Sequence, residues 1–294
     1  MPSANWEHFA LYRSVRDAIA ALPVYFRTET HISGVIATDL HTLNSLLGAT
    51  IEEQVVRTLN LIRNAWDPQG HYALYHFVRQ PQTFPDVRLR KSSGEETLLG
   101  IELKGWYLLA KEGEPSLRFQ ASPDACAPQD LIVVVPWVLG NVISGAPILF
   151  EPFIESAKYA AEFRNHHWQN VRKAKGESAV DLAVNVRPYP LKNDAILDRP
   201  REDAGGNFGR IARTGLMDEY IARLDAFPLC GVKMGFWREF LRAFQESSND
   251  EEARAALDRL RQRVRRGMSH SAPKVQAALA IVAELEKLLE LPSD

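Results

Sequence analysis

The stretch DLIVVVPWV, residues 130–138, constrains the fold more than any other part of the chain. After its first aspartate it is apolar throughout, and it has the length of a single strand. Strands without alternation of polar and apolar residues are covered on both faces, as happens when helices pack on both sides of a sheet. The chain is therefore expected to contain a sheet with a buried central strand.

Helical and strand-like patterns alternate around this strand. Residues 38–66 predict two helices that meet near Gly48, and residues 72–119 predict an antiparallel meander. A long helix is expected over residues 148–175, and the apolar alternation in residues 179–190 predicts another strand. The order predicts an α/β fold, with a central mixed β-sheet flanked by helices and additional N- and C-terminal helices; Ser3 is the expected cap of the first helix.

Composition narrows the class of protein. The chain has 294 residues and a net charge of −2, which gives no sign of a generally basic, nucleic-acid-coating surface. Its two cysteines, Cys126 and Cys230, lie far apart, so neither a disulfide framework nor a structural zinc site is expected. No apolar run has membrane-spanning length and no secretory signal is recognisable, which predicts a cytoplasmic protein with no membrane partner.

The meander holds an unusual group of charges. Phe84 to Gly113 forms two strand-like halves around a Ser-Ser-Gly tip, and paired residues should sum to 187 or 188. Asp86 then faces Ile101 or Glu102, while strand alternation places Lys104 on the same face as Glu102. Two carboxylates and an ammonium are thus expected at one point of a sheet, where unpaired charges are costly.

A divalent cation between Asp86 and Glu102 would relieve this repulsion. Two carboxylates suit Mg²⁺, with Mn²⁺ as a substitute, because this ion keeps several waters and shares its other sites with phosphate. Lys104 could then orient or deprotonate a water, or stabilise the phosphate at which it attacks. The alternative from the residues alone is a salt bridge on an edge hairpin, with no chemistry.

Pro85-Asp86, followed after the turn by Glu102-Leu103-Lys104, resembles the PD-(D/E)xK nuclease superfamily, and the chain length is similar to that of type II restriction endonucleases. The resemblance covers about residues 50–188. It implies a restriction-endonuclease-like core in which Asp86 and Glu102 bind the metal and Lys104 is the catalytic lysine. It also implies a helix glutamate, and Glu52 fits this role because it lies on the apolar stripe of its helix.

The resemblance implies a Mg²⁺-dependent endonuclease that cuts double-stranded DNA as a homodimer, most simply a sequence-specific type II restriction enzyme. One domain over residues 1–294 is expected, with a catalytic core at about 50–188 and a helical part at about 207–291. A nonspecific repair or phage-defence nuclease and a non-catalytic DNA-binding α/β protein stay open as alternatives. The C-terminal helices are candidates for dimerisation.

Basic residues on the expected long helix are candidates for a DNA channel, against the plainer interpretation of a solvated helix face. A second basic run follows Leu257, where phosphate contact and exposed surface are equally compatible with the pattern. The polar loop 191–210 is a further candidate for base contact. The helix candidates for DNA binding are Lys158, Arg164, Arg172 and Lys173.

Overall fold

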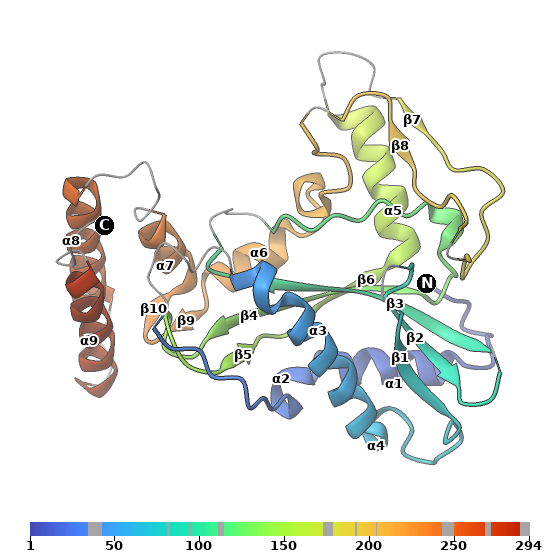
Figure 1. The fold of residues 1–294 in the computed structure, drawn as a ribbon, viewed down its shortest axis with the longest axis horizontal. Coiled ribbons are helices and arrows are strands. Elements are labelled where there is room, and N and C mark those ends of the chain that lie inside the picture. The colour runs from blue at the N-terminus through green and yellow to red at the C-terminus, as the bar shows by residue number, and fades with distance from the viewer. Residues whose placement is uncertain are drawn as a thin grey trace.

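The computed structural model describes residues 1–34, 43–80, 83–94, 96–110, 115–172, 179–191, 193–203, 205–242, 250–267 and 272–288. Its main feature is a mixed six-stranded sheet flanked by helices (Figure 1), which confirms the predicted fold class. The strands of this sheet are β1 (Tyr75–Arg79), β2 (Val87–Lys91), β3 (Thr97–Tyr107), β4 (Leu131–Leu139), β5 (Pro147–Leu149) and β6 (Phe153–Ser156).

The strands β3 and β4 form the parallel centre of the sheet. On one side, β2 and then β1 continue it in antiparallel pairing. On the other side, β5 and β6 both pair antiparallel with β4, one along each half of its length. Every residue of β4 is buried, as the apolar stretch predicts.

Helices cover both faces of the sheet (Figure 1). α3 packs against β3 and β1, and α5 contacts β4 and β6 from the other side. The helices are α1 (Phe9–Ala20), α2 (Leu22–Tyr25), α3 (Leu43–Leu61), α4 (Arg63–Trp66), α5 (Ala157–His166), α6 (Asp218–Asp225), α7 (Met234–Leu241), α8 (Asp250–Gly267) and α9 (Ala272–Leu288). Shorter elements are η2 (Pro123–Ala125), η3 (His167–Val171), η4 (Ile211–Thr214) and the small hairpins β7 (Val180–Asp181) with β8 (Arg199–Pro200) and β9 (Pro228–Leu229) with β10 (Val232–Lys233).

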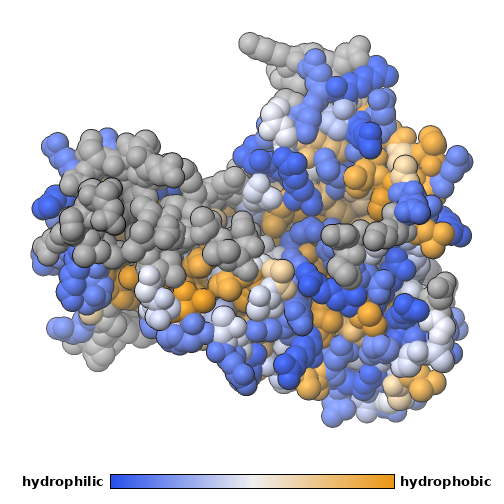
Figure 2. Space-filling model, viewed as in Figure 1, coloured by the Kyte–Doolittle hydropathy of each residue, from blue (hydrophilic) through white to orange (hydrophobic). Residues whose placement is uncertain are grey.

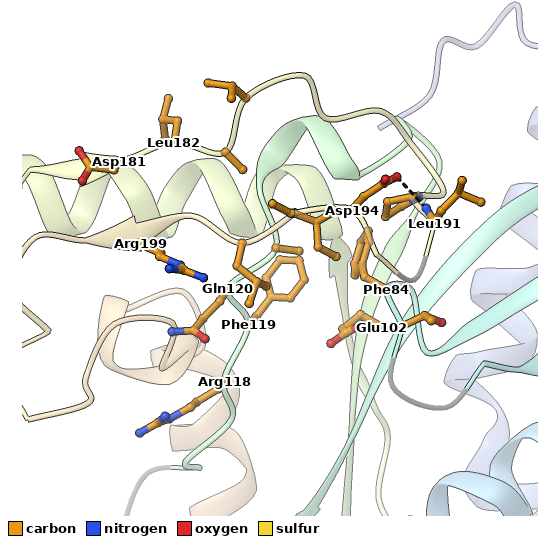
Figure 3. A pocket seen from close by; sticks show the side chains of 18 of the residues that line it. Phe84, Glu102, Arg118, Phe119, Gln120, Asp181, Leu182, Leu191, Asp194 and Arg199 are labelled. Carbon is orange, nitrogen blue, oxygen red and sulfur yellow. Dashed lines mark hydrogen bonds between the residues drawn. The ribbon is translucent and has the colours of Figure 1, made fainter.

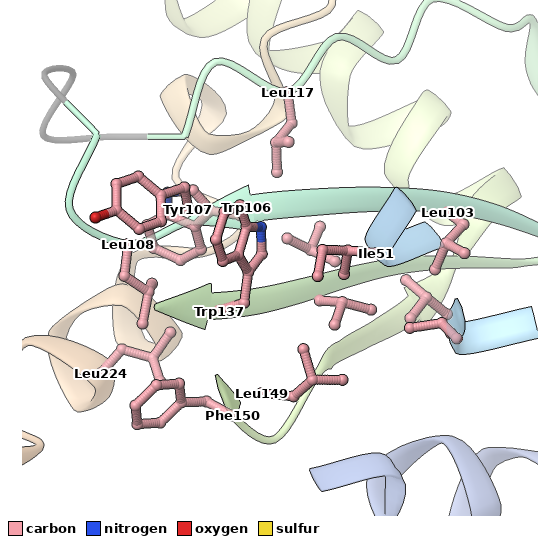
Figure 4. Packing of buried hydrophobic residues seen from close by; sticks show 14 of the residues in the cluster. Ile51, Leu103, Trp106, Tyr107, Leu108, Leu117, Trp137, Leu149, Phe150 and Leu224 are labelled. Carbon is pink, nitrogen blue, oxygen red and sulfur yellow. The ribbon is translucent and has the colours of Figure 1, made fainter. Parts of the chain in front are cut away.

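The central strands contribute large aromatic side chains to the core. Figure 4 shows Tyr107 and Trp137, from neighbouring strands, side by side, with ring centroids 4.7 Å apart. Leu224 of α6 lies among the same cluster, so the chain after the sheet contributes to its core. The α8–α9 hairpin lies at the far end of the molecule (Figure 1), where Leu257, Leu260 and Val264 are buried as the apolar line of that helix predicts.

Three local expectations were wrong. α3 passes through Gly48 without a break, since helical hydrogen bonding tolerates a glycine at modest cost. Residues 148–175 do not form one helix: β5 and β6 come first, because their backbones complete the open edge of β4, and α5 begins only at Ala157. Ser3 does not cap the first helix, which begins after His8; its hydroxyl accepts a hydrogen bond from the Asn5 amide instead.

The strand expected over residues 179–190 is also absent from the main sheet. Only Val180 and Asp181 pair, with β8, and Leu182 and Val184 are 56% and 79% exposed. Their alternation therefore does not mark a buried face. No helix in the described ranges is both long and apolar enough to span a membrane.

The β2–β3 hairpin is built around a close contact at Gly100. A Cβ at this position would lie 2.3 Å from Cγ of Pro85 and 2.9 Å from Oδ1 of Asp130. The Asp130 carboxylate also accepts the Gly100 amide at 2.7 Å and the Ala127 amide at 2.8 Å. The absence of a side chain at Gly100 thus allows Pro85 to pack on the strand and fixes the chain just before Asp86.

Gly100→Ala is expected to lower the free energy of unfolding by ~1–3 kcal/mol, because Pro85 and the strand must move apart to admit the methyl group. Urea denaturation followed by circular dichroism measures the change. Gly48→Ala is the matched control: a Cβ there meets nothing within 4 Å, so this variant should gain up to ~1 kcal/mol in helix propensity. Equal stability of Gly100→Ala and wild type would contradict the contact.

Candidate active site

The hairpin register places Asp86 against Glu102. Val87 pairs with Ile101 and Arg88 with Gly100, so the sum of 188 brings Asp86, one residue before β2, opposite Glu102. Ile101 and Leu103 face α3, where they meet Val55 and Leu59. By strand alternation, Glu102 and Lys104 point to the opposite face.

Lys104 lies between the two acids. Its Nζ is 2.6 Å from Oε1 of Glu102 and 3.1 Å from Oδ2 of Asp86. The Glu102 side chain is 10% exposed, against 27% for Asp86 and 22% for Lys104. The predicted convergence of two carboxylates and one ammonium therefore exists, at the border between core and solvent.

β2 is shorter than β3 and begins at Val87, opposite Ile101. In the described residues, the part of β3 beyond Ile101 therefore has no strand on its β2 side. The paired residues end at Ile101, yet β3 continues to Tyr107. Side-chain carboxylates take the place of strand carbonyls beyond this point. Asp86 Oδ2 accepts the Leu103 amide at 3.2 Å, and Glu52 Oε1 accepts the Gly105 amide at 3.3 Å. The same groups that form the site thus satisfy the exposed edge of the sheet.

Glu52 reaches this edge from α3. Gly105 lies close to α3, since a Cβ on it would be in ordinary van der Waals contact, at 3.5 Å, with the Gly48 Cα one turn earlier in the helix. The other oxygen of Glu52 lies 3.3 Å from the Arg79 guanidinium at the end of β1. Sequence reasoning did not single out Arg79, although its register position opposite Val87 places it next to Asp86. Glu53, by contrast, is exposed.

Burial and mutual repulsion perturb the ionisation of these groups. Burial raises the pKa of Glu102 to about 7; Lys104 opposes this shift and Asp86 adds to it. Burial also raises the pKa of Glu52, again with a contribution from Asp86. Burial alone would lower the pKa of Lys104, but Glu102 and Asp86 outweigh it and hold the pKa above its usual value. Lys104 is therefore an ammonium at neutral pH.

A cleft with a volume of about 800 Å³ opens beside Asp86 and Glu102. Figure 3 shows Glu102 and Phe84 at one end and Arg118, Gln120 and Arg199 toward the other. The outer wall is the chain from Asp181 to Arg199, where the Leu191 amide donates to Asp194 at 2.8 Å. The site thus has room for a large ligand directly next to its carboxylates.

The wall of the cleft is partly apolar. Figure 2 shows apolar surface at the upper right, where Figure 1 places β7 and the chain after it. Its most exposed apolar residues are Leu182, Val184, Leu191 and Leu197. The cationic side chains of the lining are Arg118, which was not among the predicted DNA contacts, and Arg199, which belongs to the candidate loop 191–210.

Arg164 does not belong to a DNA-binding surface, contrary to the prediction. Its side chain is 1% exposed and forms an ion pair with Asp198 at 2.7 Å. The same guanidinium donates to the carbonyls of Phe119 at 2.7 Å and Ala121 at 3.0 Å. Arg164 therefore connects α5 to the strand-like segment 117–121 and to the chain before β8. Its partners are distant in sequence, which explains why the helix pattern did not reveal them.

The other three DNA candidates differ in position. Lys158 is half-buried on α5, and Arg172 lies at the end of η3 with its guanidinium 4.2 Å from the ring centroid of Trp168. Lys173 lies outside the described residues. None of Lys158, Arg164 and Arg172 lines the cleft beside Glu102. The DNA contacts predicted for Lys158, Arg172 and Lys173 therefore stay a prediction, whereas Arg164 is buried.

The donor set at the site fits Mg²⁺ better than a zinc-like ion. In the described parts of the chain, no three His, Cys, Asp or Glu side chains are arranged to hold a metal together. Asp86 and Glu102 form a two-carboxylate pair, which is how Mg²⁺ is often bound when phosphate and water complete its shell. Burial and, to a lesser extent, repulsion by Asp86 raise the pKa of Glu102, and a cation between the two carboxylates would relieve this repulsion.

Comparison with protein-family models, with curated proteins and with solved structures finds no match to this chain. Function is therefore inferred from the geometry of Asp86, Glu102, Lys104 and Glu52, and from their place beside the cleft.

Arg164→Ala is expected to lower the free energy of unfolding by ~3–5 kcal/mol, because it leaves Asp198 buried without its partner. Arg199→Ala is the control, since Arg199 is exposed and its loss should change stability by less than ~0.5 kcal/mol. Urea denaturation of both variants measures the difference. A stable Arg164→Ala protein that had lost only DNA affinity would restore the surface role predicted from sequence.

Proposed function

We propose that this chain is a Mg²⁺-dependent endonuclease that hydrolyses phosphodiester bonds of double-stranded DNA, in the class of type II restriction enzymes. The observation that carries the proposal is the convergence of Asp86, Glu102 and Lys104 with Glu52 at the free edge of β3, beside a large cleft. The resemblance of the hairpin to the PD-(D/E)xK pattern supports it, as does the mixed sheet that presents this hairpin.

Each side chain has a role in this proposal. Asp86 and Glu102 hold the metal, and Glu52 supports the site from α3. When bound, Mg²⁺ supplies charge neutralisation of the phosphate and a water with a lowered pKa. Of the roles predicted for Lys104, stabilising the charge that develops on the phosphate suits its cationic form, while accepting a proton does not. Arg79 positions Glu52 through their ion pair.

DNA would enter the cleft lined by Arg118 and Arg199, which are candidates for phosphate contact in place of the α5 residues. A homodimer is part of the proposal, because cutting both strands of a palindrome requires two sites related by a two-fold axis. The α8–α9 hairpin, at the end of the molecule away from the sheet, remains the candidate for dimerisation.

Lys104→Ala is expected to reduce cleavage of plasmid DNA by at least ~10²-fold, because the positive charge next to the scissile phosphate is lost. Digestion with Mg²⁺ and with EDTA, resolved on agarose gels, measures this. Lys91→Ala is the matched control: it removes the other lysine of the same hairpin, whose partner is Glu96 rather than the site.

The pattern of the digest separates the functional classes. Discrete fragments support a restriction enzyme, and a smear supports a nonspecific nuclease. Intact plasmid with wild-type protein under a range of divalent metals would contradict the nuclease proposal and leave an ion-pair cluster in a non-catalytic protein. Full activity of Lys104→Ala would contradict the assigned site.

Metal binding can be tested without DNA. Saturating Mg²⁺ at ~100 times its dissociation constant should stabilise the wild-type protein by ~2.7 kcal/mol, because the ion binds only the folded site. Glu102→Gln should abolish this shift in a thermal melt. Glu96→Gln, which removes an exposed carboxylate at the start of the same strand, should leave it unchanged. An equal shift in both variants would place the ion elsewhere.

A further inference from the structure

The cleft beside Glu102 has the size of a site for a small ligand. Its volume of about 800 Å³ falls within the range of roughly 300–1,000 Å³ that is usual for pockets that enclose such ligands. A DNA duplex, by contrast, is held along an extended surface that makes many contacts to its phosphates. The cleft therefore fits a group of nucleotide size better than it fits two paired strands.

The charges of the lining do not match a run of phosphates. The cleft is lined by two arginines and four acids: Arg118, Arg199, Asp86, Glu102, Asp181 and Asp194. Two of these acids form the proposed metal site, and the other two belong to the outer wall. A nucleic-acid backbone, which carries one negative charge per nucleotide, would meet acids along the length of the cleft. An uncharged group is the better occupant beyond the metal site.

The outer wall offers apolar side chains to such a group. Four of its residues are exposed although they are apolar: Leu182, Val184, Leu191 and Leu197. Figure 3 shows Leu182 and Leu191 on the side of the cleft formed by this wall. The faces of a nucleobase are flat and apolar, and an enzyme that takes a base out of the stack packs it against apolar and aromatic side chains. The wall has the composition that this packing requires.

Polar anchors hold the wall in place without covering its leucines. Asp198 accepts the Ala183 amide at 3.1 Å and forms its ion pair with Arg164 at 2.7 Å. On the other side of the cleft, Ala121 forms a β-bridge with Leu197. Side chains that are positioned before a ligand arrives lose less conformational entropy on binding it. The exposed leucines therefore belong to a surface that is already formed.

Gln120 gives the cleft a group that can distinguish one base from another. Figure 3 shows its side chain in the same part of the lining as Arg118 and Arg199. Gly209, with a φ of +84°, leaves room for it, because a Cβ there would lie 2.6 Å from Cγ of Gln120. A side-chain amide donates and accepts hydrogen bonds, and the edge of an unpaired base offers partners for both.

We propose that the cleft takes one unpaired nucleotide of the bound DNA, with its base against Leu182 and Leu197 and the edge of the base at Gln120. Arg118 and Arg199 contact the phosphates on either side of this nucleotide. The inference rests on the proposed function, because it starts from a phosphodiester held at the metal site. The nucleotide comes either from a duplex that extrudes it or from a single-stranded stretch of DNA.

Fluorescence anisotropy of the full-length protein in EDTA, which prevents metal-dependent cleavage, tests the proposal with three labelled DNAs. These are a paired duplex, the same duplex with one unpaired nucleotide, and the single strand. At least one of the two DNAs with unpaired bases should bind roughly tenfold more tightly than the paired duplex, because its base need not be unstacked from a pair. Tightest binding of the duplex with the unpaired nucleotide supports extrusion from a duplex, and tightest binding of the single strand supports a single-stranded source. Affinity for the paired duplex as high as for the other two, or no binding of any of the three, would overturn the proposal.

Leu182→Ala and Leu197→Ala should each weaken binding of the preferred DNA roughly fivefold, since each removes apolar surface that the base covers, and should leave the paired duplex unaffected. Leu74→Ala is the matched control. Leu74 is 60% exposed, against 56% for Leu182, and lies outside the cleft. An equal effect of Leu74→Ala and Leu182→Ala would overturn the assignment of the wall.

Gln120→Ala tests recognition of the base. The unpaired nucleotide of the duplex is varied among the four bases, and the differences in affinity that the wild type shows should disappear in this variant, which a merely structural role of Gln120 would not cause. The same base preference in both proteins would overturn the role of Gln120. Tighter binding of unpaired DNA by a protein that cuts no plasmid would support the cleft assignment and contradict the nuclease alone. Plasmid cleavage by a protein with equal affinity for all three DNAs would overturn the cleft assignment and leave the nuclease standing.

Discussion

The site depends on one constraint of the sheet: β2 is shorter than β3 and pairs with it only as far as Ile101. Past Ile101, β3 pairs with β4 on one side, but on the β2 side the described residues provide no strand, so the amides that point there need other acceptors. Asp86 and Glu52 supply them, so two carboxylates are drawn to the edge of the sheet by a backbone requirement. Glu102 and Lys104 project from the same stretch of β3. The structural need and the proposed chemical use therefore coincide in one set of side chains.

A second organising interaction holds the opposite side of the cleft. Arg164 lies at the junction of α5, the segment 117–121 and the chain that leads into β8. Residues of that segment, among them Arg118 and Gln120, line the large cleft. A single buried guanidinium thus holds one wall of the cleft in place.

The hairpin and the central strand could be predicted from sequence because their signals are local. Each signal spans only a few residues: the Ser-Ser-Gly turn, the strand alternation in 97–104 and the apolar run of β4. The turn and the alternation together predicted that Asp86, Glu102 and Lys104 lie close to one another. Glu52 followed from its position on the apolar stripe of α3. The strand expected at 179–190 failed because alternation marks burial only when another layer covers the face. Arg164 was misplaced because its partner, Asp198, is 34 residues away in sequence.

The β-bulge in the hairpin has a consequence for how this chain can vary. Arg90 pairs with Thr97, whereas Leu89 pairs with Leu99, so Leu98 is an extra residue in β3. If the pairing continued from Arg90 and Thr97 without the bulge, Asp86 would lie opposite Ile101 and would point to the other side of the sheet from Glu102. The turn beyond the bulge can change in length at little cost, since it is exposed. A deletion of one residue between the bulge and Glu102 would instead separate the two acids onto opposite faces of the sheet.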